Sequence, residues 1–259
     1  MSKVIAVTGK GGTGKTMLSA LMVRLLGQGK EAKILAIDAD SSVSLSYALG
    51  LEIGKTLSDI RADLIDKPGA RKEIMGIHVK EVIKDLVEYG EGFDLLVMGR
   101  SEGPGCYCGI NDLLRYGIES LSKEYDFTLI DGEAGPEQIN RRVLRNIDTL
   151  LIVTDTSHRG FKTADVIHKI ADRRKADEGD RFNNPSADLI QEGLVINRLK
   201  GSEEVVRTAA QRLGLRVFGY IPEDENISEY DLLGKPLIDL PESSPVIEAV
   251  RMILEKIGL

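Results

Sequence analysis

One stretch decides the fold of this 259-residue chain: Gly9-Lys10-Gly11-Gly12-Thr13-Gly14-Lys15-Thr16. It fits the pattern G-x-x-x-x-G-K-[ST], and it lies between the apolar run 4–7 and the helical pattern 15–26. Glycines let successive N–H groups turn toward phosphate oxygens, and the start of the helix adds its positive dipole end. Lys15 is expected to reach the β- and γ-phosphates, and the Thr16 hydroxyl to coordinate Mg²⁺. The stretch predicts a loop that binds Mg·ATP, since a chance glycine-rich turn would not explain the flanking strand and helix.

Apolar runs alternate with helical patterns along the rest of the chain. The expected strands cover residues 4–7, 34–37, 93–98, 127–130, 149–153, 193–196 and 217–221, and the expected helices cover residues 15–26, 109–121, 164–174, 203–213 and 245–257. Residues 48–71 show no strand period and are expected to leave the sheet. Continuous Val/Ile/Leu strands separated by helices are typical of a mostly parallel sheet covered on both faces. The predicted fold class is α/β, a doubly wound P-loop NTPase in which residues 1–259 form one domain.

The composition is typical of a globular protein, with 42% hydrophobic and 29% charged residues, and the net charge is −7. The negative charge argues against a nucleic-acid partner and against an anionic membrane, because both are bound through clustered Lys and Arg. No run of 18 apolar residues occurs, and the start of the sequence has no signal-peptide pattern. A cytoplasmic protein is therefore expected.

Carboxylates follow two of the expected strands. Asp38 and Asp40 come after the strand 34–37, at the edge where ligands bind in open α/β sheets, and Asp131 ends the strand 127–130. A carboxylate placed there can orient water or hold Mg²⁺ through water, although helix capping remains an alternative for Asp38. A plain turn would not explain why acidic strand ends recur beside a phosphate loop.

The lysine after the first glycine makes the loop similar to the deviant Walker A family, K-G-G-x-G-K-T. This family includes the nitrogenase iron protein and the Min and Par partition ATPases. The resemblance implies that Lys10 acts across the interface of a homodimer on the partner's nucleotide; a lysine merely exposed on the loop is the alternative. It also implies that Asp40 positions the attacking water, that Asp131 belongs to the Walker B strand beside Mg²⁺, and that Gly135 offers its amide to the γ-phosphate. Together with Lys15, Lys10 would stabilise charge that develops during phosphoryl transfer.

The strand 193–196 ends in Asn197 and Arg198, and Pro222 follows the next strand. Related ATPases use an asparagine at such a strand end to bind adenine. The resemblance therefore implies that Asn197 reads the base, with Arg198 and Pro222 nearby. A simple turn is the alternative.

The two cysteines of the chain, Cys106 and Cys108, stand in one glycine-rich segment before the helical pattern 109–121. Thiols near the start of a helix favour the thiolate form. Two ligands do not complete a tetrahedral metal site, but two such segments brought together by a twofold axis would supply four thiolates. The alternative is two small buried residues in a tight loop.

The pattern G-x-G-C-Y-C, together with Asp131-x-Glu133-Ala134-Gly135-x-Glu137 and Arg141-Arg142, resembles the CooC family over essentially the whole chain. These accessory ATPases mature nickel-containing carbon monoxide dehydrogenase, and relatives serve acetyl-CoA synthase. The resemblance implies that Cys106 and Cys108 bind nickel or zinc between two subunits, and that ATP hydrolysis opens and closes the dimer. The implied partner is the apo nickel enzyme.

Two other functions stay open. An electron-transfer ATPase like the nitrogenase iron protein would carry an iron–sulfur cluster, but that family has a cysteine after the Walker B aspartate and residues 132–138 contain none. A partition or positioning ATPase often ends in a basic amphipathic helix. Residues 245–257 have few basic side chains, and their apolar spacing fits one buried face.

Overall fold

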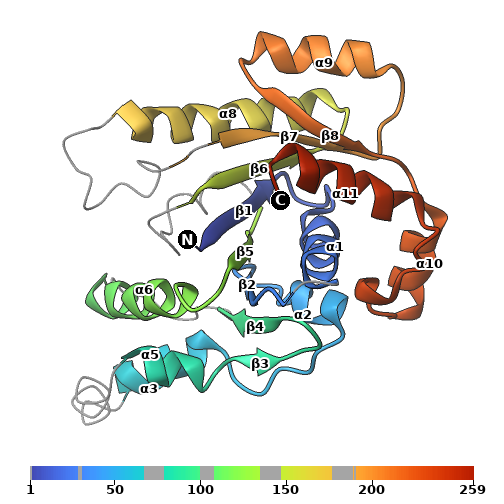
Figure 1. The fold of residues 1–259 in the computed structure, drawn as a ribbon. Coiled ribbons are helices and arrows are strands. Elements are labelled where there is room, and N and C mark those ends of the chain that lie inside the picture. Colours follow the sequence, from blue (N-terminus) through green and yellow to red (C-terminus); the bar gives the residue numbers. More distant parts are fainter. Residues whose placement is uncertain are drawn as a thin grey trace.

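The computed structural model describes residues 2–28, 31–66, 79–99, 108–134, 147–176, 189 and 191–259, and of residues 63–66, 108–114 and 173–176 the backbone alone. Within these ranges eight strands form one sheet in the order β3-β4-β2-β5-β1-β6-β7-β8 (Figure 1). The strands are β1 (Lys3–Gly9), β2 (Ile34–Asp38), β3 (Glu88–Tyr89), β4 (Asp94–Val97), β5 (Phe127–Asp131), β6 (Thr149–Thr154), β7 (Gln191–Asn197) and β8 (Arg216–Ile221).

Helices cover both faces of the sheet (Figure 1). They are α1 (Lys15–Gly27), α2 (Ser44–Leu49), α3 (Leu57–Asp66), α5 (Val79–Lys84), α6 (Cys108–Ser122), α8 (His158–Ala176), α9 (Glu203–Arg212), α10 (Glu225–Leu233) and α11 (Pro245–Lys256), with a 3-10 turn, η2 (Leu237–Asp239). Side chains of α1, α2 and α11 form one core, and those of α5, α6, α8 and α9 form the other. Because successive side chains of a strand point to opposite faces, Ile5 and Val7 enter the first core while Val4 and Ala6 enter the second.

The strand register brings the functional ends together. β1 lies between β5 and β6, and all described pairs are parallel except β3 with β4. Asp38 at the end of β2 is in register with Asp131 at the end of β5, and also with Val97 at the end of β4. The carboxyl ends of these strands therefore share the edge at which β1 enters the phosphate loop.

The predicted doubly wound, mostly parallel sheet is confirmed, and each of the seven expected strands is present. The structure adds the short antiparallel edge strand β3 and the helix α10, neither of which the sequence patterns indicated. Residues 57–66, expected only to leave the sheet, form α3. Among the described helices, none has the length and apolar character needed to cross a membrane.

Candidate nucleotide-binding site

The phosphate loop connects the end of β1 to the start of α1 and depends on glycine at two close approaches. Gly9 has φ +145°, and a Cβ there would lie 2.0 Å from the carbonyl oxygen of Val153. Gly14 has φ +92°, and a Cβ there would lie 2.2 Å from Nδ2 of Asn197. The Thr13 hydroxyl fixes the loop, because it donates to the carbonyl of Lys10 at 2.7 Å. A side chain at Gly9 would collide with the backbone of β6, and one at Gly14 would collide with the side chain of Asn197.

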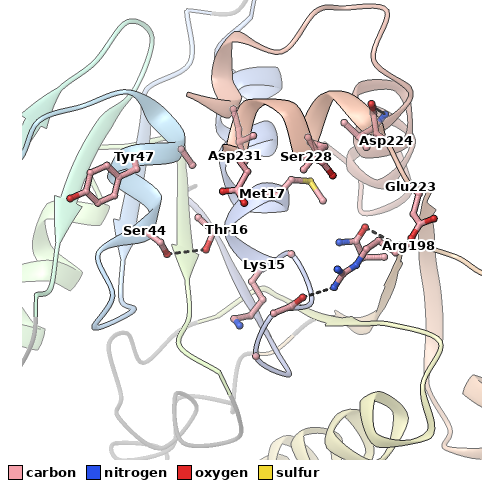
Figure 2. A pocket seen from close by; sticks show the side chains of 18 of the residues that line it. Lys15, Thr16, Met17, Ser44, Tyr47, Arg198, Glu223, Asp224, Ser228 and Asp231 are labelled. Carbon is pink, nitrogen blue, oxygen red and sulfur yellow. Dashed lines mark hydrogen bonds between the residues drawn. The ribbon is translucent and has the colours of Figure 1, made fainter. Parts of the chain in front are cut away.

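Two side chains at the start of α1 face the interior of the site (Figure 2). Lys15 is largely buried, and its Nζ lies 3.4 Å from the carbonyl oxygen of Lys10. The Thr16 hydroxyl lies 3.2 Å from the hydroxyl of Ser44 at the start of α2. The loop thus holds an ammonium group and a pair of hydroxyls close to the edge of the sheet.

Asp131 is fully buried beneath this loop. Its Oδ1 accepts a hydrogen bond from the Ser19 hydroxyl at 3.0 Å, whereas Oδ2 has no hydrogen-bond partner within the described part of the chain. Burial raises the pKa of Asp131 to about 7; the nearby hydroxyls of Thr16 and Ser19 oppose the rise, and the charge of Asp38 adds to it. A buried carboxylate oxygen without a partner, next to a threonine hydroxyl, is a donor set that fits Mg²⁺.

Asp38 holds the loop after β2 in shape. It is fully buried, its Oδ1 accepts from the amide of Asp40 at 3.1 Å, and its Oδ2 accepts from the amide of Leu45 at 2.9 Å. Burial raises its pKa to about 6, although these amides lower it. Both oxygens are used within the chain, so the capping role is the one the geometry displays for Asp38.

Asp40 is half-buried and lines the cavity. Its Oδ1 accepts from the amide of Ser42 at 2.9 Å and from the Ser42 hydroxyl at 2.8 Å. The structure thus brings Asp40 to the same edge as Lys15, Thr16 and Asp131, where a carboxylate can meet a water molecule.

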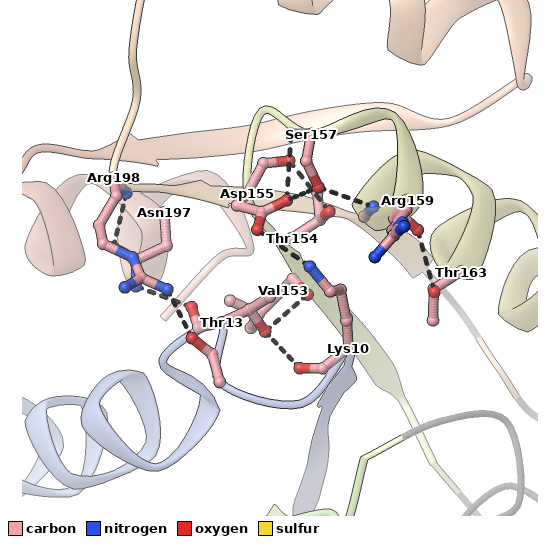
Figure 3. Close-up of polar contacts among 12 residues, drawn as sticks. Lys10, Thr13, Val153, Thr154, Asp155, Ser157, Arg159, Thr163, Asn197 and Arg198 are labelled. Carbon is pink, nitrogen blue, oxygen red and sulfur yellow. Dashed lines mark hydrogen bonds and ion pairs between the residues drawn. The ribbon is translucent and has the colours of Figure 1, made fainter.

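The other lysine of the loop points to a different neighbour (Figure 3). The Lys10 ammonium lies 3.3 Å from Oδ2 of Asp155, a residue between β6 and α8. Burial raises the pKa of Asp155, but hydrogen bonds from Ser157 and the interaction with Lys10 outweigh it and hold the pKa below its usual value. Lys10 is therefore paired within its own chain.

Two residues at the end of β7 hold the phosphate loop through hydrogen bonds to its carbonyls, a contact called here the β7 clamp. Nδ2 of Asn197 donates to the Thr13 carbonyl at 2.7 Å, while Oδ1 accepts from the Arg198 amide at 2.8 Å. The Arg198 guanidinium donates to the carbonyl of Gly12. The backbone of Arg198 lies in the left-handed region, at φ +51°. Asn197, Arg198 and Pro222 all line the cavity. The amide of Asn197 is engaged with the loop in this state.

These residues surround an open cavity of about 1190 Å³. Its far wall comes from α10 and the loop before it, including Glu223, Asp224, Ser228 and Asp231, and Tyr47 of α2 stands at the opposite side (Figure 2). The volume is ample for a nucleotide. Sequence patterns missed this wall, although Asp224, whose side chain caps α10 by accepting from the amide of Asn226, offered a helix-start signal.

Three of the predicted site residues lie wholly or partly outside the part of the chain that the structure describes. Gly135 and Cys106 lie outside the described residues, and Cys108 begins α6 with only its backbone described. The preceding strand β4 is placed: the amide of Met98 donates to the carbonyl of Asp38 at 2.9 Å. The last described residues before the cysteine pair therefore follow β4 at the edge of the sheet that carries the phosphate loop.

The strand-to-helix loop, its two lysines and the acidic strand ends define a P-loop nucleotide-binding protein. More particularly, the chain belongs to the CobQ/CobB/MinD/ParA nucleotide binding domain family, which matches residues 4–237, and it is an ATPase. It is 40% identical over 260 residues to an uncharacterized ATP-binding protein of Methanocaldococcus jannaschii, with 98% of each chain covered.

Two further comparisons are informative. The chain is 28% identical over 270 residues to the carbon monoxide dehydrogenase accessory protein CooC of Rhodospirillum rubrum, which covers 98% of this chain and 97% of that one. The solved structure of the septum site-determining protein MinD from Pyrococcus horikoshii, complexed with Mg-ADP, superposes with a TM-score of 0.70 at 22% identity, covering 100% of this chain and 96% of that one. The latter likeness establishes the fold.

Proposed function

We propose that this ATPase works as a homodimer that carries a divalent metal, nickel or zinc, on Cys106 and Cys108 and assists nickel insertion into carbon monoxide dehydrogenase or acetyl-CoA synthase. The observation that supports the proposal is that the cysteine pair follows β4 in the sequence, and β4 ends at the nucleotide edge of the sheet. In the sequence Cys106 precedes α6 and Cys108 is its first residue, and the preceding strand β4 ends against Asp38 on the nucleotide edge of the sheet. The likeness to the CooC accessory protein over nearly the full length of both chains supports it.

ATP hydrolysis at the phosphate loop would use groups that the structure brings together. Asp40 orients water toward the γ-phosphorus, and the bond to the ADP oxygen breaks as the new P–O bond forms. Lys15 stabilises charge on the transferred phosphoryl group, and Lys10 does so from the partner subunit. The Thr16 hydroxyl and Asp131 would hold Mg²⁺, which supplies positive charge that neutralises the phosphates.

The cysteines would act through pairing of two subunits. One chain offers two thiolates, which leaves a tetrahedral site half complete, and a twofold axis supplies the other two. ATP-dependent closure would then gather four thiolates around one metal, and hydrolysis would loosen that geometry and allow transfer. Metal affinity and nucleotide state are thereby linked.

The test is the number of metal ions bound per chain, measured by equilibrium dialysis against Ni²⁺ and Zn²⁺ with and without ATP. The wild-type protein is expected to bind about half a metal ion per chain with ATP, as four ligands from two chains require. The double variant Cys106→Ser/Cys108→Ser should lose the metal while its affinity for ATP stays within about twofold, because no thiol is needed at the phosphate loop. Stoichiometric metal on the double variant would contradict the proposal.

The same preparations separate the competing functions. A broad brown absorption under anaerobic conditions would favour an iron–sulfur cluster on the cysteines over a carried metal ion. Co-sedimentation with anionic vesicles would favour a positioning ATPase. Against the latter stands α11, whose apolar residues Val246, Val250 and Ile253 are buried in the core formed with α1 and β8 rather than displayed.

A further inference from the structure

The ion pair between Lys10 and Asp155 joins the phosphate loop to the start of α8 (Figure 3). Lys10 follows the end of β1, and Asp155 follows the end of β6, the strand adjacent to β1 in the sheet. The Nζ–Oδ2 distance is 3.3 Å, and the side chains are 35% and 26% exposed. The pair is therefore partly shielded and formed by two backbone segments that the sheet holds in place.

Hydrogen bonds from Ser157 orient the carboxylate of Asp155 independently of Lys10. Its Oδ1 accepts from the amide of Ser157 at 3.1 Å and from the Ser157 hydroxyl, which is the geometry of an Asx turn ahead of a helix. The first turn of α8 comes so close that a Cβ at Gly160 would lie 2.5 Å from the same oxygen. With Oδ1 committed to Ser157, Oδ2 is the oxygen left to face Lys10.

We propose that Asp155 is a positioning residue that holds Lys10 in its own subunit until ATP-dependent pairing of two chains draws the lysine away. The inference rests on the proposed homodimer in which Lys10 acts in trans. In the proposed dimer the Lys10 ammonium contacts the partner's nucleotide instead of Asp155, from which it lies 3.3 Å in this structure. Each subunit must therefore break its own pair before the dimer closes.

The expected effect follows from the exposure of the pair. A partly exposed ion pair changes an equilibrium by about 2- to 5-fold. Because closure breaks one pair in each of two subunits, the effect on dimerisation is squared, to about 4- to 25-fold. Asp155 thus sets how much protein and nucleotide are needed before the dimer forms.

The test compares Asp155→Asn with wild type by sedimentation velocity over a protein concentration series, with Mg²⁺ and adenylyl imidodiphosphate. Asparagine keeps an oxygen for Ser157 and removes the charge that holds Lys10. The dimer dissociation constant of the variant is expected to be about 4- to 25-fold lower than that of wild type. The difference should shrink at about 1 M salt, where charges are screened within about 3 Å.

The matched control is Asp165→Asn, which removes the same charge from α8. Asp165 is 22% exposed and pairs with Lys169 at 2.6 Å, away from the phosphate loop. Its dimer dissociation constant should stay within about twofold of wild type, as for a surface pair outside the interface. Thermal unfolding of both variants checks that they fold; if Asp155→Asn is unstable, Asp155→Ser, which also caps a helix start, takes its place.

Three outcomes would overturn the inference. Equal dimerisation of Asp155→Asn and wild type, or weaker dimerisation of the variant, would contradict the restraint on Lys10 while leaving the homodimer standing. A gain that high salt does not reduce would show that the effect is not that of an ion pair. Wild-type protein that stays monomeric at every concentration would contradict the proposed homodimer itself, and with it this role of Asp155.

Discussion

The two sides of the phosphate loop differ in how their polar groups are satisfied. The Asp131 side consists of Lys15, Thr16, Ser19 and Asp131, and the Lys10 side consists of Lys10, Thr13, Asp155, Asn197 and Arg198. On the Asp131 side, a fully buried carboxylate oxygen is left without a hydrogen bond in the described structure. On the Lys10 side, the ammonium group, the threonine hydroxyl and both ends of the Asn197 amide are bonded within the chain.

A ligand on the Asp131 side would therefore add a missing interaction. A ligand on the Lys10 side would have to replace interactions that the chain already makes. A buried polar atom without a partner lowers stability by about 1–3 kcal/mol, and a bound cation would remove that cost. Contacts on the Lys10 side stabilise the loop in its present conformation, so a ligand that rearranges them must offset their loss.

Replacing Lys15 should have the largest effect. Its ammonium group is mostly buried at the start of α1, with the phosphate loop folded over it. Lys15→Ala should lower the rate of ATP hydrolysis by at least about 100-fold, because one charged contact to the transferred phosphoryl group is lost. Phosphate release is the measurement, with Lys169→Ala on the surface of α8 as the control. Hydrolysis within a few-fold of wild type would show that the Asp131 side does not contact the phosphates.

Asp131 should make the nucleotide-free protein less stable as the pH rises. Burial raises the pKa of Asp131 from 3.8 to about 7. Between pH 4 and 7 the folded chain therefore holds a proton that the unfolded chain has lost, and the free energy of unfolding falls as pH increases. The fall attributable to this group is on the order of 2–4 kcal/mol, at 1.36 kcal/mol per pKa unit.

Urea unfolding of Asp131→Asn at pH 5 and pH 8 checks this sign. The variant should lose less stability across the interval than wild type, and keep the smaller fall that Asp38, with a pKa raised to about 6, produces. The control Asp165→Asn changes a partly buried carboxylate that pairs with Lys169 on α8, and it should follow the wild-type profile. Parallel profiles for Asp131→Asn and wild type would mean that Asp131 is ordinarily ionised in the folded chain.

Two glycines of the loop offer the smallest and sharpest comparison. Gly12 and Gly14 both have positive φ, at +72° and +92°, but only a Cβ at Gly14 would collide with Asn197. Gly12→Ala should lower the free energy of unfolding by about 1 kcal/mol, from backbone strain. Gly14→Ala should lower it by about 2–3 kcal/mol, because the Asn197 contact with Thr13 is also disturbed. Equal losses, measured by urea unfolding, would show that the β7 clamp contributes little.

Much of the fold was predictable because its signals are local. Continuous apolar strands, helical spacing and the glycine–lysine pattern each act over a few residues, and β1, α1 and the central strands followed from them. The role of Asp38 could not be settled the same way, since a strand-end carboxylate can bind a ligand or cap a loop. Only the placement of Leu45 over its oxygen decides between them.

The partner of Lys10 was missed for a related reason. Asp155 follows the expected strand 149–153, so it carried the same strand-end signal as Asp38 and Asp131. What selects it is the adjacency of β6 to β1, which is a long-range property of the sheet. The helix α10 was not predicted because none of its residues is buried, so its sequence shows no apolar period.

Titration of the purified protein with ATP at pH 8, with and without Mg²⁺, shows whether the Asp131 side holds a cation beside the nucleotide. Mg²⁺ should strengthen ATP binding to wild type, and Asp131→Asn should lose most of this gain while it binds metal-free ATP nearly as well. The contrary result would be an equal Mg²⁺-dependent gain in both proteins, which would place the cation away from Asp131.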